Sequence, residues 1–173
     1  MKRTTQAVCR CAVLTALAMA LSWLEGGLPL SWAVPLPGVK LGLANLVTLF
    51  ALYALGPGES ACILFCRCFL GGLFAGNLSA LAFSLMGGAA ALGAMWLVVR
   101  TEKCSLYGVS IAGAAAHQCG QVAAAILQLG NWGPLYYLPI LLGVSLGTGS
   151  LTAFAASLLF QRFQRLPVGR RED

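Results

Sequence analysis

The chain has 173 residues, of which 59% are hydrophobic and only 9% are charged. An average soluble domain carries roughly 25% charged residues, so this composition excludes an ordinary soluble protein and predicts an integral membrane protein. The formal net charge of +6 would suit a nucleic-acid partner. However, the basic residues are not interleaved with aromatic residues and instead flank the apolar runs, so we interpret the charge as a signal of membrane topology.

Apolar runs separated by short breaks predict six membrane-spanning helices in a single domain covering residues 1–173. A spanning helix needs about 20 apolar residues, so six of them leave room only for short loops. Glycine, proline and asparagine mark the breaks, as at Gly56-Pro57-Gly58 and Gly76-Asn77. The predicted spans are about 8–30, 41–55, 60–75, 78–99, 106–129 and 135–160.

The positions of lysine and arginine predict how these spans are oriented, because such residues concentrate in cytoplasmic loops. With six spans, all 11 basic residues except Lys40 and Arg67 fall on one side. Both termini are therefore expected to be cytoplasmic. The segment 26–40 and the turns at 76–77 and 131–132 are expected to face outward.

Polar side chains within or beside the spans are candidates for a functional site, because placing them in hydrocarbon is costly. Arg67 and His117 lie near the middle of their spans, and Gln121 is one helical turn outward of His117. The remaining candidates lie nearer the outer ends. The predicted outward-facing pocket binds substrate through Glu25, Lys40, Asn45, Arg67, Asn77, His117 and Gln121.

Four of these residues also have a structural alternative. Arg67 could be neutralised by a carboxylate or by carbonyl groups, and His117 and Gln121 could link helices through hydrogen bonds. Lys40 could extend its ammonium group to the membrane surface. These alternatives stay open at the level of sequence.

Recognisable catalytic motifs are missing from the sequence. The only aspartate is Asp173, so no aspartate-rich pair can hold magnesium on a diphosphate. There is no Walker loop, no HExxH motif and no serine nucleophile with a paired His and Asp. The seven cysteines lack CxxC spacing and are expected to pack as small apolar residues. We therefore predict no enzyme activity, no catalytic residue, no metal and no cofactor.

Small residues recur at every fourth position of the first predicted span, at Ala12, Ala16 and Ala20. This spacing gives a flat helix face that another backbone can approach closely. The face could pack inside the bundle or bind a partner protein.

Two stretches carry a family resemblance: PLPGVKLGLANLVTLFALYALG at 35–56 and GAAAHQCGQ at 113–121. They resemble a bacterial family called heptaprenyl diphosphate synthase component I, or Gx transporters, and the resemblance covers about 12–160. That family is similar to the S components of energy-coupling factor vitamin transporters. The resemblance implies a six-helix S-component-like bundle in the bacterial cytoplasmic membrane, with 26–40 as a loop closing over substrate. It also implies that Ala12, Ala16 and Ala20 bind a transmembrane coupling subunit.

Two functions follow as hypotheses. The first is an S-component-like transport protein that binds a small organic solute, such as a vitamin or cofactor precursor, from outside and is coupled to separate ATPase subunits. The second is a non-catalytic membrane component in isoprenoid, quinone or flavin-linked redox metabolism. The expected partners are the lipid bilayer, the coupling subunit with its ATPases, and the solute, with no role for nucleic acid.

Overall fold

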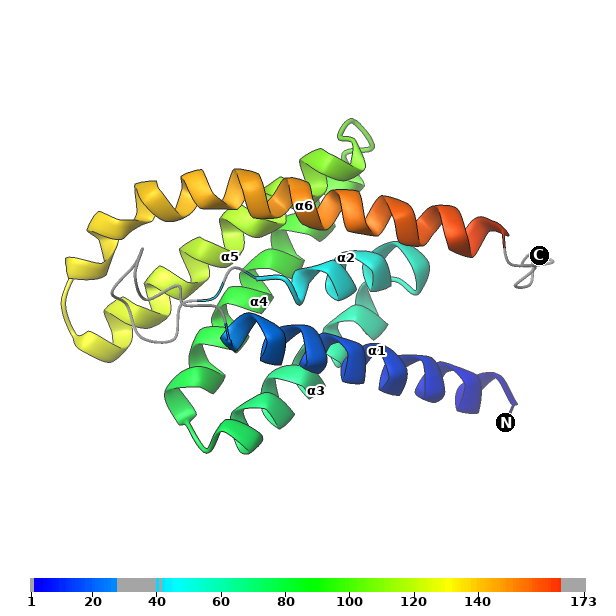
Figure 1. Ribbon diagram of the computed structural model, residues 1–173, viewed down its shortest axis with the longest axis horizontal. Helices are drawn as coiled ribbons and strands as arrows, with labels where there is room; N and C mark the ends of the chain where they lie inside the picture. The colour runs from blue at the N-terminus through cyan, green and yellow to red at the C-terminus, as the bar shows by residue number, and fades with distance from the viewer. Residues whose placement is uncertain (1, 28–39, 41, 166–173) are drawn as a thin grey trace.

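The computed structural model describes residues 2–27, 40 and 42–165, and within these ranges the regular structure is entirely helical. Figure 1 shows the helices as a bundle in which the N-terminal end of α1 and the C-terminal end of α6 lie at the same end of the molecule. The elements in chain order are α1 (Lys2–Gly26), α2 (Asn45–Ala54), α3 (Pro57–Ala75), α4 (Leu78–Arg100), α5 (Leu106–Leu129), the 3-10 helix η2 (Gly133–Tyr137) and α6 (Leu138–Arg165).

Four helical stretches of the described chain are long and apolar enough to cross a membrane: Thr5–Gly26, Pro57–Ala75, Leu78–Arg100 and Gly133–Arg162. They support a multi-pass membrane protein, as the composition predicts. Helix α5 has 24 residues but is not one of these stretches. Its middle holds a histidine and two glutamines, which lower its hydropathy and are buried against the other helices.

The predicted second span is only partly helical. Helix α2 begins at Asn45 and has ten residues, a length of about 15 Å, or half of the hydrocarbon thickness. Residues 42–44 before it are not helical, and Gly42 has a φ of +87°, which residues other than glycine rarely adopt. The helix therefore begins at Asn45, four residues after the predicted start of the span. The predicted end of span one at residue 30 lies outside the described residues, as does most of the predicted loop 26–40.

Three helix boundaries in α3 and α5 agree with the local signals in the sequence. Gly76 ends α3 in the left-handed conformation, with φ at +59°, and Gly130 ends α5 in the same way, with φ at +64°. The Ser105 side chain accepts a hydrogen bond from the backbone N–H of Gly108 and caps α5. These ends depend only on neighbouring residues, which explains why the sequence predicts them.

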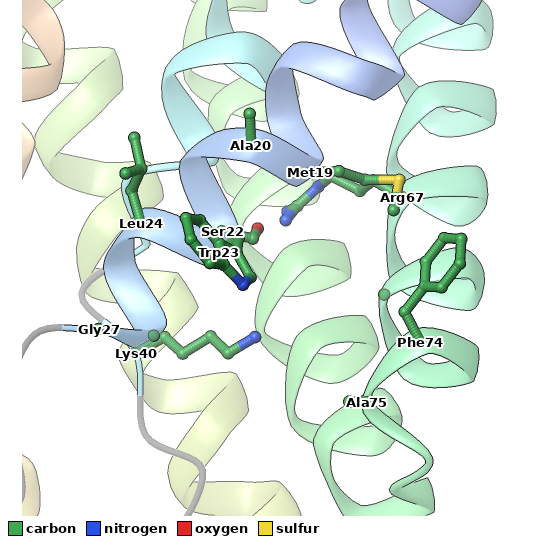
Figure 2. Close-up of a pocket in the computed structure, with 12 residues that line it drawn as sticks. Met19, Ala20, Ser22, Trp23, Leu24, Gly27, Lys40, Arg67, Phe74 and Ala75 are labelled. Atoms are coloured by element: carbon green, nitrogen blue, oxygen red, sulfur yellow. The ribbon is translucent and has the colours of Figure 1, made fainter.

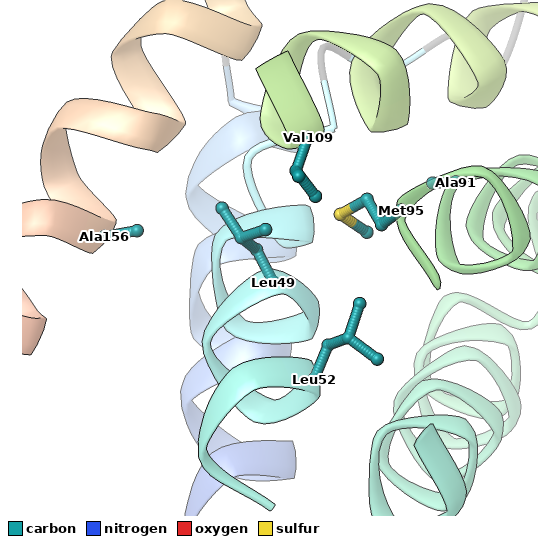
Figure 3. Close-up of a cluster of buried hydrophobic side chains, with 6 residues drawn as sticks. All are labelled: Leu49, Leu52, Ala91, Met95, Val109 and Ala156. Atoms are coloured by element: carbon teal, nitrogen blue, oxygen red, sulfur yellow. The ribbon is translucent and has the colours of Figure 1, made fainter. Parts of the chain in front are cut away.

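Helix α2 lies at the centre of the bundle and contacts each of the other five α-helices. Seven of its ten residues are buried. Figure 3 shows Leu49 and Leu52 of α2 in one cluster with Met95 of α4, Val109 of α5 and Ala156 of α6. A short apolar helix of this kind is a buried core element. It holds the longer helices together and fixes the position of the chain that precedes it.

Candidate functional site

The carboxylate of Glu25, at the C-terminal end of α1, binds the chain that leads into α2. Its oxygens accept hydrogen bonds from the backbone N–H groups of Gly42 and Leu43, the latter at 3.1 Å. Glu25 is only 1% exposed, and a buried carboxylate needs such partners. Gly42 and Leu43 lie just before Ala44, the N-cap residue of α2. Glu25 therefore fixes the backbone that leads into α2 from 17 positions away in the chain.

Two glutamines of α5 bind the backbone of Lys40. Its N–H donates to Gln121 Oε1 at 3.1 Å, and its carbonyl accepts from Gln118 Nε2 at 3.3 Å. Both glutamine side chains are fully buried. Non-helical backbone at membrane depth requires partners of this kind, because lipid offers none. Together with Glu25, these two side chains stabilise the non-helical backbone before α2.

His117 of α5 fills the space between this segment and α4. A methyl group added at Gly42 would lie 3.0 Å from His117 Cδ2 and 2.8 Å from Asn45 Nδ2, and one added at Gly87 would lie 2.8 Å from His117 Cε1. Only glycine fits on either side of the imidazole. The Asn45 amide has no hydrogen-bond partner among the described residues. The space around Gly42 is therefore tightly packed but contains polar groups without partners.

A cleft of about 900 Å³ lies beside this segment, between α1 and α3. Figure 2 shows the side chains of Lys40 and Arg67 extending into it from opposite sides. Arg67 is 7% exposed, and its Nε and Nη2 atoms have no hydrogen-bond partner in the described part of the chain. Lys40 Nζ donates to Ser84 Oγ at 3.4 Å. The apolar lining includes Met19, Trp23, Leu24 and Phe74.

The structure separates the predicted site residues into three groups. Lys40 and Arg67 line the cleft, whereas Glu25 and Gln121 bind backbone groups of the segment before α2. His117 and Asn45 lie against Gly42 and are not in the cleft lining.

Asn77 has a different position from the other predicted residues. Its Oδ1 accepts hydrogen bonds from the N–H groups of Ser79 at 2.9 Å and Ala80 at 3.3 Å, so it caps the start of α4. It does not line the cleft, and we leave it out of the proposed site.

Arg67 and His117 lie near adjacent residues of α4 but not in one cavity. A methyl group at Gly88 would lie 3.1 Å from Arg67 Nη2, just as one at Gly87 would meet His117. The guanidinium lines the cleft and the imidazole packs behind it. Glycine at both positions lets two polar side chains approach the α4 backbone.

Sequence reasoning missed the apolar part of the cleft. Met19, Ser22, Trp23, Gly71 and Phe74 line it, but at the end of an apolar span these residues are indistinguishable from residues facing lipid. Together with Lys40 and Arg67, these residues give the cleft two cationic groups and an apolar lining.

In the described ranges, no group of three or more His, Cys, Asp or Glu side chains could hold a metal ion.

The small residues of α1 lie on the outside of the bundle. Ala12, Ala16 and Ala20 are exposed, whereas Leu14 and Ala18 pack against α2 and α3. A second groove, of about 710 Å³, runs between this face and α3. This small-residue face is not used for packing inside the described bundle.

Together these features define an all-helical, multi-pass membrane protein with a polar interior and a cationic cleft. Residues 14–159 match the family model described as heptaprenyl diphosphate synthase component I. The chain therefore belongs to the heptaprenyl diphosphate synthase component I family, as its sequence predicts. Comparisons with curated proteins and with solved structures give no match.

Proposed function

We propose that the protein is an S-component-like transport protein that binds a small organic solute, such as a vitamin or a cofactor precursor, in the cleft between α1 and α3. The observation that carries the proposal is the cleft of about 900 Å³ with a buried, unpartnered Arg67 in its wall. Ligand pockets typically measure about 300–1,000 Å³ and combine an apolar lining with a few polar groups. This cleft has that size and that composition.

The non-helical chain before α2 supports a transport role. Membrane proteins tolerate such backbone only where protein or a water-filled cavity surrounds it, and transporters use it to build binding sites near the middle of the bilayer. Here Lys40 belongs to this segment and also lines the cleft. Binding of a solute to Lys40 would therefore act directly on the segment that connects α1 to α2.

The proposed energy source is a separate ATPase, joined to this protein through a transmembrane coupling subunit. The exposed face formed by Ala12, Ala16 and Ala20 supports this arrangement, since small residues at four-residue spacing let helices approach closely. Substituting Ala16→Leu should weaken co-purification of the coupling subunit and leave solute binding unchanged. Equal recovery of that subunit with Ala16→Leu would exclude this face as its docking surface.

Native mass spectrometry of the protein, gently extracted from its own membrane, tests the proposal. We expect one bound small molecule, together with coupling and ATPase subunits. Protein that carries neither a small molecule nor these subunits would contradict the proposal.

A second candidate is a non-catalytic role in prenyl diphosphate metabolism at the membrane. The family match favours it, and Lys40 and Arg67 would contact the diphosphate. The same mass spectra distinguish the two candidates. A prenyl diphosphate or a synthase subunit would be retained in place of a water-soluble solute and ATPases.

A further inference from the structure

We propose that the ligand of the cleft is an organic anion, with one carboxylate or phosphate group on an apolar body. This inference rests on the proposed function, namely that the cleft between α1 and α3 binds a solute. It goes further by assigning the charge and shape of that ligand.

The first observation is that the guanidinium of Arg67 is incompletely paired. Arg67 is 7% exposed, and its Nε and Nη2 have no hydrogen-bond partner in the described part of the chain. A buried cation without a paired anion is strongly unfavourable. A lone arginine inside a membrane protein is therefore expected to pair with something, and the Arg67 side chain extends into the cleft (Figure 2).

The second observation is that no described carboxylate accepts a hydrogen bond from Nε or Nη2 of Arg67. Glu25 accepts the N–H groups of Gly42 and Leu43 and interacts with Arg67 only through its charge. Glu59 is exposed in the first turn of α3, about 12 Å along the helix from Arg67, and lines the other groove. Glu102 is exposed in the connection between α4 and α5. An anion that accepts hydrogen bonds from Nε and Nη2 of Arg67 would therefore come from outside the described residues.

The third observation is the composition of the rest of the cleft. Lys40 brings a second cation, and its ammonium has only the neutral Ser84 hydroxyl as a hydrogen-bond partner among the described residues. Trp23, Met19 and Phe74 add aromatic and apolar surface. An acid group between the two cations would leave the remainder of the ligand against these side chains. Carboxylate and phosphate both suit an arginine fork, which binds them with two hydrogen bonds.

Two fluorescent probes that differ by one anionic sulfonate group test this inference: 8-anilinonaphthalene-1-sulfonate and its neutral parent, N-phenyl-1-naphthylamine. Each would be titrated into full-length protein in phosphatidylcholine nanodiscs, with empty discs subtracted. We expect saturable binding of the anionic probe and at least about tenfold weaker binding of the neutral one. Arg67→Gln should weaken binding of the anionic probe about 30-fold, because it removes one member of a buried charge pair.

Two further variants control for net charge and for the charge of Arg67 itself, and a third provides an alternative test. Arg162→Gln makes the same change in net charge at an exposed position outside the cleft and should leave the affinity unchanged. Arg67→Lys keeps the charge and should retain part of the binding. If Arg67→Gln does not fold, Lys40→Gln at the partly exposed side of the cleft provides the test, with about tenfold weaker binding expected.

The outcomes separate this inference from the proposed function. If both probes bind equally and Arg67→Gln has no effect, the anion assignment is overturned, while the cleft remains a solute site. If neither probe binds saturably to the wild-type protein, both the inference and the proposed function are overturned.

Competition then identifies the source of the anion, which is either a free solute or a lipid headgroup. Displacement of the probe by phenyl phosphate added in water indicates a free solute. Displacement by phosphatidylglycerol included in the disc, with phenyl phosphate inactive, indicates a lipid headgroup. Either result supports the charge assignment, and displacement by neither contradicts it.

Discussion

Glu25 and Arg67 are both ionisable and buried, yet they differ in what surrounds them. The Glu25 carboxylate accepts two backbone N–H groups, which makes it part of the scaffold. The Arg67 guanidinium has Nε and Nη2 without partners in the described chain and lies in the wall of the cleft. A satisfied buried charge contributes to folding, whereas an unsatisfied one is available to a ligand.

Replacing Glu25 should destabilise the protein even though the site retains its shape. Glu25→Gln removes the negative charge, and its amide nitrogen cannot accept one of the two backbone N–H groups. Hydrogen bonds to charged groups contribute about 1.5–3 kcal/mol, so we expect a loss of about 2 kcal/mol in the free energy of unfolding. Denaturant unfolding in detergent micelles measures it. Glu59→Gln, at an exposed position, is the control, and an equal loss in both variants would contradict a stabilising role for the two hydrogen bonds of Glu25.

Gly42 lies at a position where a side chain meets both close contacts and an unfavourable backbone conformation. Gly42→Ala places a methyl group 2.8 Å from Asn45 Nδ2 and 3.0 Å from His117 Cδ2, at a φ of +87°. The backbone conformation alone costs about 1–2 kcal/mol. We expect a lower melting temperature than for Gly93→Ala, where the added methyl group has no neighbour within 4 Å. Equal melting temperatures would show that the chain before α2 is not tightly packed.

Arg67 stands out in the sequence because a charge in an apolar span is costly wherever it points, whereas Lys40 stands out as a lone cation just before the predicted second span. The partners of Glu25 could not be identified in this way, since its bonds to Gly42 and Leu43 depend on how α1 packs beside α2. The capping role of Asn77 follows from its position before α4, but that local signal also fits a residue at the mouth of a pocket.

At the scale of elements, α2 and the α4–α5 pair determine the architecture. Helix ends at Gly76 and Gly130 were predictable, because a glycine in the left-handed conformation is a local signal. The short length of α2 was not predictable, because residues 41–55 are apolar enough to form a helix throughout. Glu25, Gln118 and Gln121 stabilise the non-helical backbone there, and they come from two other helices.

The contact between α4 and α5 depends on Gly120. A methyl group at this position would lie 2.5 Å from the Met86 carbonyl oxygen and 2.9 Å from Gly87 Cα, both of which belong to the α4 backbone. Backbone atoms cannot move aside as a side chain can, so Gly120→Ala should destabilise the bundle by about 1–3 kcal/mol. Gly143→Ala in α6, with no neighbour within 4 Å, should be close to neutral. Thermal unfolding that ranks Gly143→Ala as the worse variant would contradict this packing.

At the scale of the whole molecule, the charge pattern predicts that six segments cross the membrane, with both termini in the cytoplasm. The N-terminal end of α1 and the C-terminal end of α6 lie at one end of the bundle, as an even number of crossings requires (Figure 1). The short α2, with the chain before it, would form one of these crossings.

Cysteine labelling tests this orientation. Cys104 is exposed in the connection between α4 and α5, which is predicted to be cytoplasmic, and should react with a membrane-impermeant maleimide only after permeabilisation. Asn131→Cys, in the turn before η2, should react in intact cells. Each cysteine is tested alone, in a chain whose other cysteines are replaced. Labelling of Cys104 from outside would contradict the six-crossing topology.

The central claim is that the cleft between α1 and α3 holds the ligand. The most direct test compares native mass spectra of the wild-type protein with those of a variant whose cleft is filled. Gly71 lines the cleft, and the space beside its Cα is open, so Gly71→Trp should fill it without disturbing the backbone. Gly143→Trp, at an exposed position on α6, is the matched control.

We predict that the ligand mass is retained by the wild-type protein and by Gly143→Trp but lost from Gly71→Trp, with all three proteins folded. A ligand retained equally by Gly71→Trp would place binding elsewhere and contradict the account.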